Sequence, residues 1–442
     1  MKRSSLLLLS MMLVFTMFLA ACSKTEEKTG TETPNTTETP KEEPKKDVSL
    51  RVFSTFGGTD AARESFQAAI DGFTSKNPNV KVENDTMSAN DDGFRTKVNT
   101  DMTSGNEPDI LFYFTGADAK GFIDAGKVVP LNEVLDANPD WKAGFAPAAL
   151  ENMTRDDGKI YSIPLTGYYE GLFVNKKIFK DNNLELPTDW DKLTKAVKTL
   201  SAKGIIPLAA PFDQSHYLIE YFMLSAAGSK GHNSGLANGI DPNWEKGYAA
   251  MKELYDLKAF PKDAATIDLS MASNYYDQGK AAMVIEGSWA IGNWKNKEVV
   301  DNTTVMPFPV MPGGLGTGKD VIGGFGSGFY ISKATYDNPD KKDAAIELLK
   351  SLTSPETIEK IANSNGGTSA AAGVEIKGTT QAATDGFAMV ASATSINKPI
   401  DNVVTPETFS ALRAGVQSIV TGKKQPADVL KEAKATEDAG TK

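Results

Sequence analysis

The chain has 442 residues, a formal charge of −10 at pH 7, one cysteine and two histidines. This length exceeds what one hydrophobic core usually supports, so two lobes are expected. The negative charge, with no basic run to offset it, argues against nucleic acid as a partner. The single cysteine excludes an intramolecular disulfide.

The N-terminus has the pattern of a secretory signal. Lys2 and Arg3 precede an apolar run over residues 6–20, which is shorter than the roughly 20 residues that span a bilayer. The following L-A-A-C resembles the lipobox of bacterial lipoproteins, in which cleavage before the cysteine leaves a lipidated N-terminal residue, here Cys22. One acyl chain holds a protein only marginally, so an anchor of more than one chain, including palmitate, is expected. Loss of Lys2 and Arg3 would change the formal charge from −10 to −12.

Residues 22–47 are expected to form a lipidated terminus and a disordered tether. After Cys22 the segment is rich in Thr, Glu, Pro and Lys and has no large apolar side chain. Such a composition cannot bury enough surface to offset its chain entropy. The sequence therefore predicts signal peptide 1–21, tether 22–47 and a folded part from Val48 onward, held at the outer face of a cell membrane.

Strand and helix patterns alternate through the folded part, which predicts an α/β fold with helices on both faces of mixed sheets. Thr188 with Asp191, Ser354-Pro355-Glu356 and Thr405-Pro406-Glu407 are typical helix starts. The predicted strands are 48–58, which ends in a glycine turn, 79–84, 108–114, 171–175, 205–210 and 281–286, with 325–332 extended. The predicted helices begin near residues 60, 92, 188, 215, 242, 354 and 405.

The segment from Gly313 to Lys319 nearly matches a phosphate-binding P-loop. Asp320 stands where that motif needs Ser or Thr for magnesium, and a carboxylate there would repel phosphate. A Pro-broken segment precedes the glycines and an extended one follows them, whereas the motif joins a strand to a helix. We therefore expect a glycine-rich crossing between lobes and no nucleotide.

The sequence offers no evident catalytic set. His216 and His232 are too few for a three-histidine zinc site, and neither G-x-S-x-G nor H-E-x-x-H is present. Paired carboxylates of the glycosidase type remain open because the chain has 57 acidic residues. We expect no enzyme activity, no cofactor and no metal.

Tyr168 and Tyr169 allow three interpretations. They could form an aromatic wall for a sugar, pack beside Tyr161 in a strand, or supply phenolate ligands to iron. Several other aromatic residues stand at the carboxyl ends of predicted strands, where open α/β sheets bind ligands, although core packing is the alternative for each. They are Phe56, Tyr113, Phe114 and Trp289.

Four stretches together resemble the bacterial extracellular solute-binding proteins of ABC importers, in particular the maltose-binding-protein-like family that binds sugars. They are G-N-E-P-D-I-L (105–111), D-G-K-I-Y-S-I-P-L-T-G-Y-Y-E-G-L-F-V-N-K-K-I-F (157–179), G-K-A-A-M-V-I-E-G-S-W (279–289) and G-G-F-G-S-G-F-Y-I-S (323–332). The likeness covers nearly the whole folded part. It departs from the family near Gln214 and His216, which are weak site candidates, and at residues 366–369.

The resemblance implies two α/β lobes that close on a solute by bending at chain crossings. The crossings would lie at residues 161–164 and 306–324. Lobe 1 would comprise 48–160 and 308–362, and lobe 2 would comprise 161–307 and 363–442. The implied ligand-binding residues are Phe56, Asp91, Phe114, Tyr168, Tyr169, Glu170, Glu286, Trp289, Gly324 and Phe325.

The implied function is capture of a mono- or oligosaccharide and its delivery to membrane permease subunits. The protein would be monomeric and tethered to the membrane by its lipid anchor. The alternatives are a binder of peptide, polyamine or iron, and a secreted carbohydrate-acting enzyme.

Overall fold

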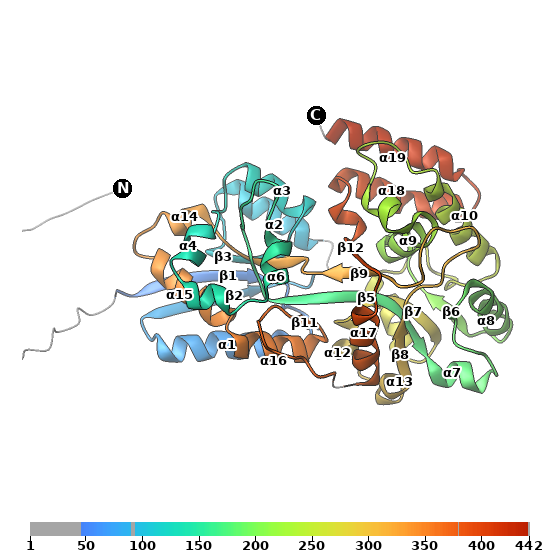
Figure 1. The fold of residues 1–442 in the computed structure, drawn as a ribbon, viewed down its shortest axis with the longest axis horizontal. Helices are drawn as coiled ribbons and strands as arrows, with labels where there is room; N and C mark the ends of the chain where they lie inside the picture. The colour runs from blue at the N-terminus through green and yellow to red at the C-terminus, as the bar shows by residue number, and fades with distance from the viewer. Residues whose placement is uncertain (1–45, 90–92, 379, 441–442) are drawn as a thin grey trace, which may run out of the picture. The chain divides into compact units, whose positions relative to one another are not determined.

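The computed structural model describes residues 46–89, 93–378 and 380–440. The predicted signal peptide, Cys22 and almost all of the tether lie outside these residues, as does Asp91. Residues 46–442 form one compact unit, which contains two sheets (Figure 1).

The first sheet has five strands in the order β2-β1-β3-β10-β4. β1 is parallel to β2 and β3, and β10 is antiparallel to its neighbours β3 and β4. Alternate side chains pack on opposite faces: Phe112 lies in one core, and Leu111 and Tyr113 lie in the other. The strands are β1 (Val48–Ser54), β2 (Val80–Thr86), β3 (Ile110–Phe114), β4 (Ile163–Pro164) and β10 (Ser327–Ile331).

The second sheet has the order β12-β9-β5-β7-β6, with β8 and β11 also paired to β5. Leu172 of β5 packs on one face and Phe173 on the other, so both faces are buried. The strands are β5 (Thr166–Asn175), β6 (Ile206–Ala209), β7 (Ala281–Gly287), β8 (Thr303–Met306), β9 (Asp320–Gly324), β11 (Thr368–Ser369) and β12 (Ser395–Asn397).

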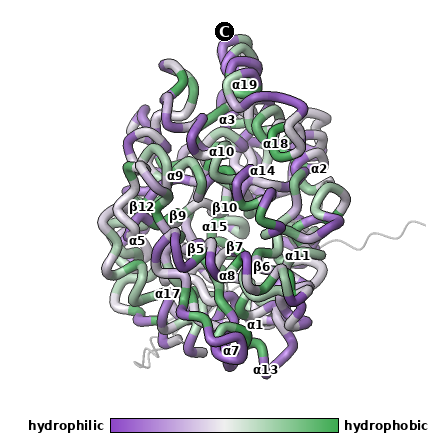
Figure 2. The backbone as a smooth tube through the Cα atoms, turned by 90° about the vertical axis from the view of Figure 1, so that its right-hand side faces the viewer, coloured by the Kyte–Doolittle hydropathy of each residue, from purple (hydrophilic) through white to green (hydrophobic). Residues whose placement is uncertain are grey.

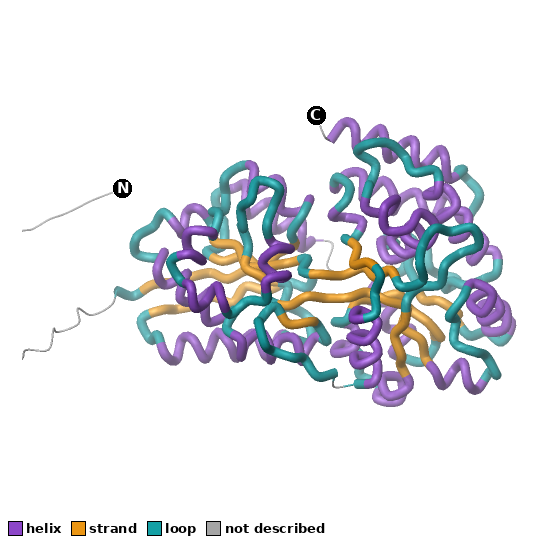
Figure 3. Tube along the Cα trace, in the orientation of Figure 1, coloured by secondary structure: helices purple, strands orange, loops and turns teal. Residues whose placement is uncertain are grey.

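Helices cover both faces of each sheet (Figure 3). Those that pack on the first sheet are α1 (Arg63–Lys76), α2 (Gly93–Ser104), α3 (Ala117–Asp124), α4 (Asn132–Asp136), α5 (Pro139–Ala143), α6 (Pro147–Met153), α14 (Lys333–Tyr336), α15 (Lys342–Leu352) and α16 (Pro355–Asn365).

The second sheet carries the remaining helices. α19 alternates between hydrophilic and hydrophobic residues along its length (Figure 2), as expected for a helix with one buried face. These helices are α7 (Lys176–Asp181), α8 (Trp190–Ala202), α9 (His216–Asn233), α10 (Asn243–Asp256), α11 (Leu269–Asp277), α12 (Ala290–Asn293), α13 (Lys297–Asn302), α17 (Gln381–Ala391), the 3₁₀ helix η1 (Ile400–Asn402), α18 (Pro406–Val420) and α19 (Pro426–Gly440).

The chain passes between the sheets at short segments. Leu165 joins β4 to β5, and Phe325 with Gly326 joins β9 to β10. The return crossing therefore comes just after the predicted range of 306–324, so this prediction was wrong. Residues 320–324 form β9 of the second sheet, and Phe308 packs in that lobe's core, although 308–362 was expected in lobe 1. Two further boundaries differ from the prediction: β4 and Leu165 belong to the first lobe, although the first crossing was expected at 161–164, and Ala370 and Ala371 pack in the first lobe's core, although 363–442 was expected in lobe 2.

The predicted α/β architecture is confirmed, with one helix start corrected. Ser354 and Thr405 cap α16 and α18, and each side chain accepts a backbone N–H three residues on. At α8 the cap is Asp189 rather than Thr188, because its Oδ1 accepts the Lys192 N–H at 2.9 Å. Among the described residues, no helix combines the length and the apolar character needed to cross a membrane.

Candidate functional site

Tyr168 and Trp289 form an aromatic pair on the second lobe, next to the crossings. Their ring centroids lie 5.6 Å apart at an interplanar angle of 46°. β7 runs antiparallel to β5, with Gly287 opposite Glu170. Trp289, two residues beyond Gly287, therefore comes close to Tyr168, two residues before Glu170. Both rings are half-buried, which leaves part of each available to a ligand.

Glu286 lies beneath this pair at the end of β7. Its side chain accepts the backbone N–H of Gly287 at 3.2 Å, and the neighbouring side chains of Ser273, Trp289 and Tyr217 favour its charged form. Burial raises the pKa of Glu286 to about 7, although these interactions with the charged form lower the pKa. A carboxyl group with this pKa can either donate to or accept from a sugar hydroxyl near neutral pH.

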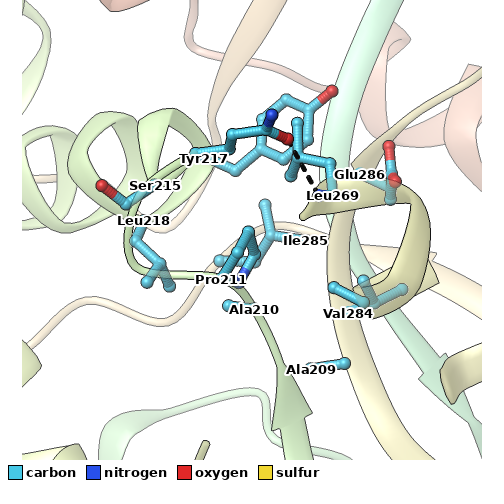
Figure 4. A pocket seen from close by; sticks show the side chains of 12 residues that line it. Ala209, Ala210, Pro211, Ser215, Tyr217, Leu218, Leu269, Val284, Ile285 and Glu286 are labelled. Carbon is cyan, nitrogen blue, oxygen red and sulfur yellow. Dashed lines mark hydrogen bonds between the residues drawn. The ribbon is translucent and has the colours of Figure 1, made fainter. Parts of the chain in front are cut away.

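A small pocket opens beside Glu286, at the carboxyl ends of β6 and β7 (Figure 4). It contains about 270 Å³ of space, part of which is open to solvent. Its polar lining consists of Gln214, Ser215, Tyr217 and Glu286, and Gln214 Oε1 accepts the Leu269 N–H at 3.0 Å. Carboxyl ends of strands are the usual ligand-binding edge of an α/β sheet, so the pocket extends the candidate site.

Glu170 of β5 lies against Glu220 of α9, deeper in the same lobe. Both are nearly fully buried, at 3% and 1% exposure. Burial is the largest cause of the raised pKa of both groups, about 8 for Glu170 and well above the usual range for Glu220, and the nearby Glu170 carboxylate raises the pKa of Glu220 further. Glu220 also holds η1 in place, because its Oε1 accepts the Ile400 N–H at 2.9 Å.

Arg95 of α2 connects the two lobes at this site. Its Nε lies 2.9 Å from Asp118 Oδ2 in its own lobe, and its Nη2 lies 3.2 Å from Asp401 Oδ2 in the other. The guanidinium also stands over Phe114, 4.6 Å from the ring centroid. The pKa of Asp401 is raised to about 6, chiefly by burial and also by the nearby charge of Asp118, whereas the charge of Arg95 lowers it.

The structure brings together only part of the predicted site. Phe114, Tyr168, Glu170, Glu286 and Trp289 lie on the facing parts of the two lobes. Gly324 pairs with Tyr168 at a φ of 116°, and Phe325 is half-buried against the first lobe's core. Contact of these seven residues with a ligand stays a prediction, and Asp91 lies outside the described residues.

Phe56 and Tyr169 pack in hydrophobic cores instead. Phe56 is 3% exposed and stacks between Phe66 and Phe112, at centroid distances of 4.5 and 4.9 Å. Tyr169 is fully buried against Phe387 on the face of β5 opposite to Tyr168. Neighbouring residues of a strand point to opposite faces, so the two tyrosines cannot bind one iron together. The described residues also contain no group of three His, Cys, Asp or Glu placed to hold a metal ion.

The glycine-rich loop does not form a phosphate cradle. Leu315 and Gly316 donate their N–H groups to the carbonyls of Ala226 and Ser225 in α9, so these donors are already occupied. A strand rather than a helix follows, since β9 begins at Asp320, whose Oδ2 accepts the Thr317 N–H. The geometry therefore agrees with the rejection of a P-loop.

Four residues of the site escaped the sequence analysis: Arg95, Tyr217, Glu220 and Asp401. One signal was present for Glu220, because it is the only charged residue in the apolar stretch Tyr217–Ala227. A charge within a buried helix needs a partner, and such residues often belong to functional sites. The other three show no local pattern.

Two α/β lobes joined by short crossings, with a polar and aromatic cluster where they face each other, define a hinged solute receptor. Residues 58–359 match the family of bacterial extracellular solute-binding proteins. The chain belongs to this family, whose members act outside the cytoplasm as binding proteins.

Relatives and solved structures agree with this assignment. The chain is 25% identical to a multiple sugar-binding protein of Streptococcus mutans over 340 residues, which covers 74% of this chain and 76% of that protein. It is 25% identical to an ABC transporter extracellular-binding protein of Pyrococcus horikoshii, but spans only 65% of that relative's length. A chitin oligosaccharide binding protein superposes with a TM-score of 0.79 at 24% identity, over 89% of this chain and 98% of the other, and shows the same fold.

Proposed function

We propose that this protein captures a mono- or oligosaccharide between its lobes and delivers it to the permease of an ABC importer. The observation that carries the proposal is the Tyr168–Trp289 pair above the buried carboxyl of Glu286. A ring face binds the apolar face of a sugar, and a carboxyl group beside it binds hydroxyls. The names of the relatives, which include sugar-binding proteins, support the same substrate class.

Binding would favour the closed arrangement, because only that arrangement lets both lobes touch the solute. A ligand shifts a conformational equilibrium by its difference in affinity for the two states. A sugar bound with micromolar affinity corresponds to about −8 kcal/mol, which still permits release to a permease.

Isothermal titration calorimetry of the folded part against mono- and oligosaccharides tests the proposal. Iron, spermidine and a short peptide serve as controls for the other solute classes. We expect heat of binding for at least one sugar and none for the controls. A response confined to the controls would contradict the sugar assignment, and release of shortened oligosaccharide on incubation would indicate an enzyme.

We also propose that Cys22 is lipidated and holds the protein at the outer face of the cell membrane. The support is the L-A-A-C sequence and the polar tether that follows it. In cells, the full chain should partition into the membrane fraction and Cys22→Ser should appear in the medium. Equal membrane association of the two proteins would disprove the anchor.

Delivery to a permease is tested by uptake. Cells that lack this protein should lose uptake of the radiolabelled sugar identified by calorimetry, and the full-length gene should restore it. Undiminished uptake in its absence would exclude a required role in import of that sugar.

A further inference from the structure

Arg95 is the side chain that ties α2 of the first lobe to η1 of the second. It is held in its own lobe by Asp118 and by the ring of Phe114, so its direction is fixed before it meets Asp401. The Asp118 and Asp401 side chains are only 10% and 23% exposed, and such shielding makes an ion pair stronger than a fully exposed one.

The segment that carries Asp401 is firmly built into the second lobe. The Ile400 N–H donates to Glu220, and His232 Nε2 lies 2.8 Å from the carbonyl oxygen of Lys398. Asn397 is also bonded, since its Oδ1 accepts from Asn233 at 2.9 Å and its amide donates to the Val321 carbonyl at 3.1 Å. η1 is thus a fixed element, so Asp401 meets Arg95 only when the lobes themselves approach.

The backbone of Gly116 comes close to the side chain of Asn402 beside this ion pair. Gly116, just before α3, has a φ of 68°, and a Cβ built on it would lie 2.1 Å from Asn402 Oδ1. A larger residue would therefore overlap the Asn402 side chain of η1 unless that side chain moved, and it would also strain the backbone. Ion pair and close approach together mark one contact surface between the lobes.

We infer that the Arg95–Asp401 ion pair is a latch that positions the lobes in the closed arrangement and so sets the fraction of closed protein before ligand arrives. Arg95 is a positioning residue in this scheme. The latch acts without ligand, but its effect on affinity rests on the proposed function. Stabilising the binding-competent state raises apparent affinity by the factor by which that state becomes more populated.

The primary test is small-angle X-ray scattering of unliganded folded protein, with the curve calculated from the structure as the closed reference. Arg95→Ala and Asp401→Asn should each raise the radius of gyration at low ionic strength. Lys97→Ala is the matched control: Lys97 is on the same helix at similar exposure, 36% against 37%, but its ion pairs with Asp85 and Asp101 stay within the first lobe. It should leave the curve unchanged.

Three further variants separate the latch from general loss of stability. Arg95→Lys keeps the charge and should restore part of the closed population. The double variant Arg95→Ala with Asp401→Asn should be no more open than either single variant, because one interaction is lost only once. Gly116→Ala should also be open, although it removes no charge. Melting temperature, measured for all, identifies any variant that is simply unfolded.

Affinity for the sugar gives the second readout. We expect Arg95→Ala and Asp401→Asn to weaken it roughly threefold to tenfold at low ionic strength, with a smaller difference from wild type in high salt. Unchanged affinity in both variants would overturn the latch. A loss of affinity with unchanged unliganded scattering would also overturn it and would assign the pair to ligand contact.

The scattering test remains valid if no sugar binds. Wild-type protein that already matches an open form without ligand, or variants that scatter like wild type, would disprove the latch and leave the proposed function intact. Failure of every sugar in the calorimetric panel would remove the proposed function, whereas an opening of the unliganded variants would still support the latch.

Discussion

The carboxyl groups of Glu170 and Glu220 face each other in the second lobe, although 50 residues separate them in the sequence. No donor from the described residues reaches Oε2 of either group. Two buried carboxylates cannot both be charged at close range, so at neutral pH at least one of the pair holds a proton. Because Glu220 also holds Ile400, this pair connects the base of the candidate site to η1.

Glu170→Gln should change how stability depends on pH. Burial raises the pKa of Glu170 to about 8, above its usual value of 4.5. The folded state then holds more protons than the unfolded state between these values, so this group's contribution is present below pH 4.5 and is lost as the pH rises to 8. One pKa unit corresponds to about 1.4 kcal/mol, and we expect a decline of roughly 2 kcal/mol because the titrations of Glu170 and Glu220 influence each other.

Urea unfolding at several pH values between 4.5 and 8 measures this effect. The difference between wild type and Glu170→Gln reports on the coupled pair of Glu170 and Glu220, because the remaining carboxyls contribute to both proteins. Glu347→Gln, on the exposed surface of α15, is the control. A difference between wild type and Glu170→Gln that stays constant with pH would contradict the raised pKa.

Glu220 should act through its hydrogen bond to Ile400. Glu220→Gln retains an acceptor oxygen and should keep the unfolding free energy close to that of wild type. Glu220→Leu leaves the buried Ile400 N–H without its acceptor, which should cost about 1–3 kcal/mol. Denaturant unfolding compares the two, and equal stability would show that the bond contributes nothing.

Trp289→Ala should reduce sugar affinity at least tenfold, since it removes one of the two rings proposed to contact the sugar. The residue is half-buried, so the melting temperature of unliganded protein should fall by only roughly 2–4 °C. Trp141→Phe, at a half-buried tryptophan on α5 of the first lobe, should leave calorimetric affinity unaltered. Wild-type affinity in Trp289→Ala would remove this residue from the site.

Phe56→Ala should behave as a core substitution. Its ring stacks on Phe66 and Phe112, and loss of a buried phenylalanine costs about 3–5 kcal/mol. Affinity, measured at a temperature where the variant is folded, should remain within about threefold of wild type. A large loss of affinity with full stability would return Phe56 to the ligand site.

The sequence by itself determined the local structure and the fold class. The alternating patterns placed most strands and helices, and the Ser-Pro-Glu and Thr-Pro-Glu starts located α16 and α18 to the residue. These features depend on interactions within a few residues, such as a side-chain oxygen that accepts a nearby N–H. Trp289 was likewise placed correctly just after β7, because strand ends can be read from the chain.

Only the tertiary structure decided which of these residues lie where the two lobes meet. Phe56 and Phe114 both stand at or just beyond strand ends, yet one is core and the other lies under Arg95. Both sheets are covered on both faces, so central strands such as β3 and β7 are almost entirely apolar and give no alternation from which to read a side chain's direction. The contacts Glu170–Glu220 and Arg95–Asp401 join residues far apart in sequence, and their partners are fixed by strand order and helix packing rather than by any local pattern.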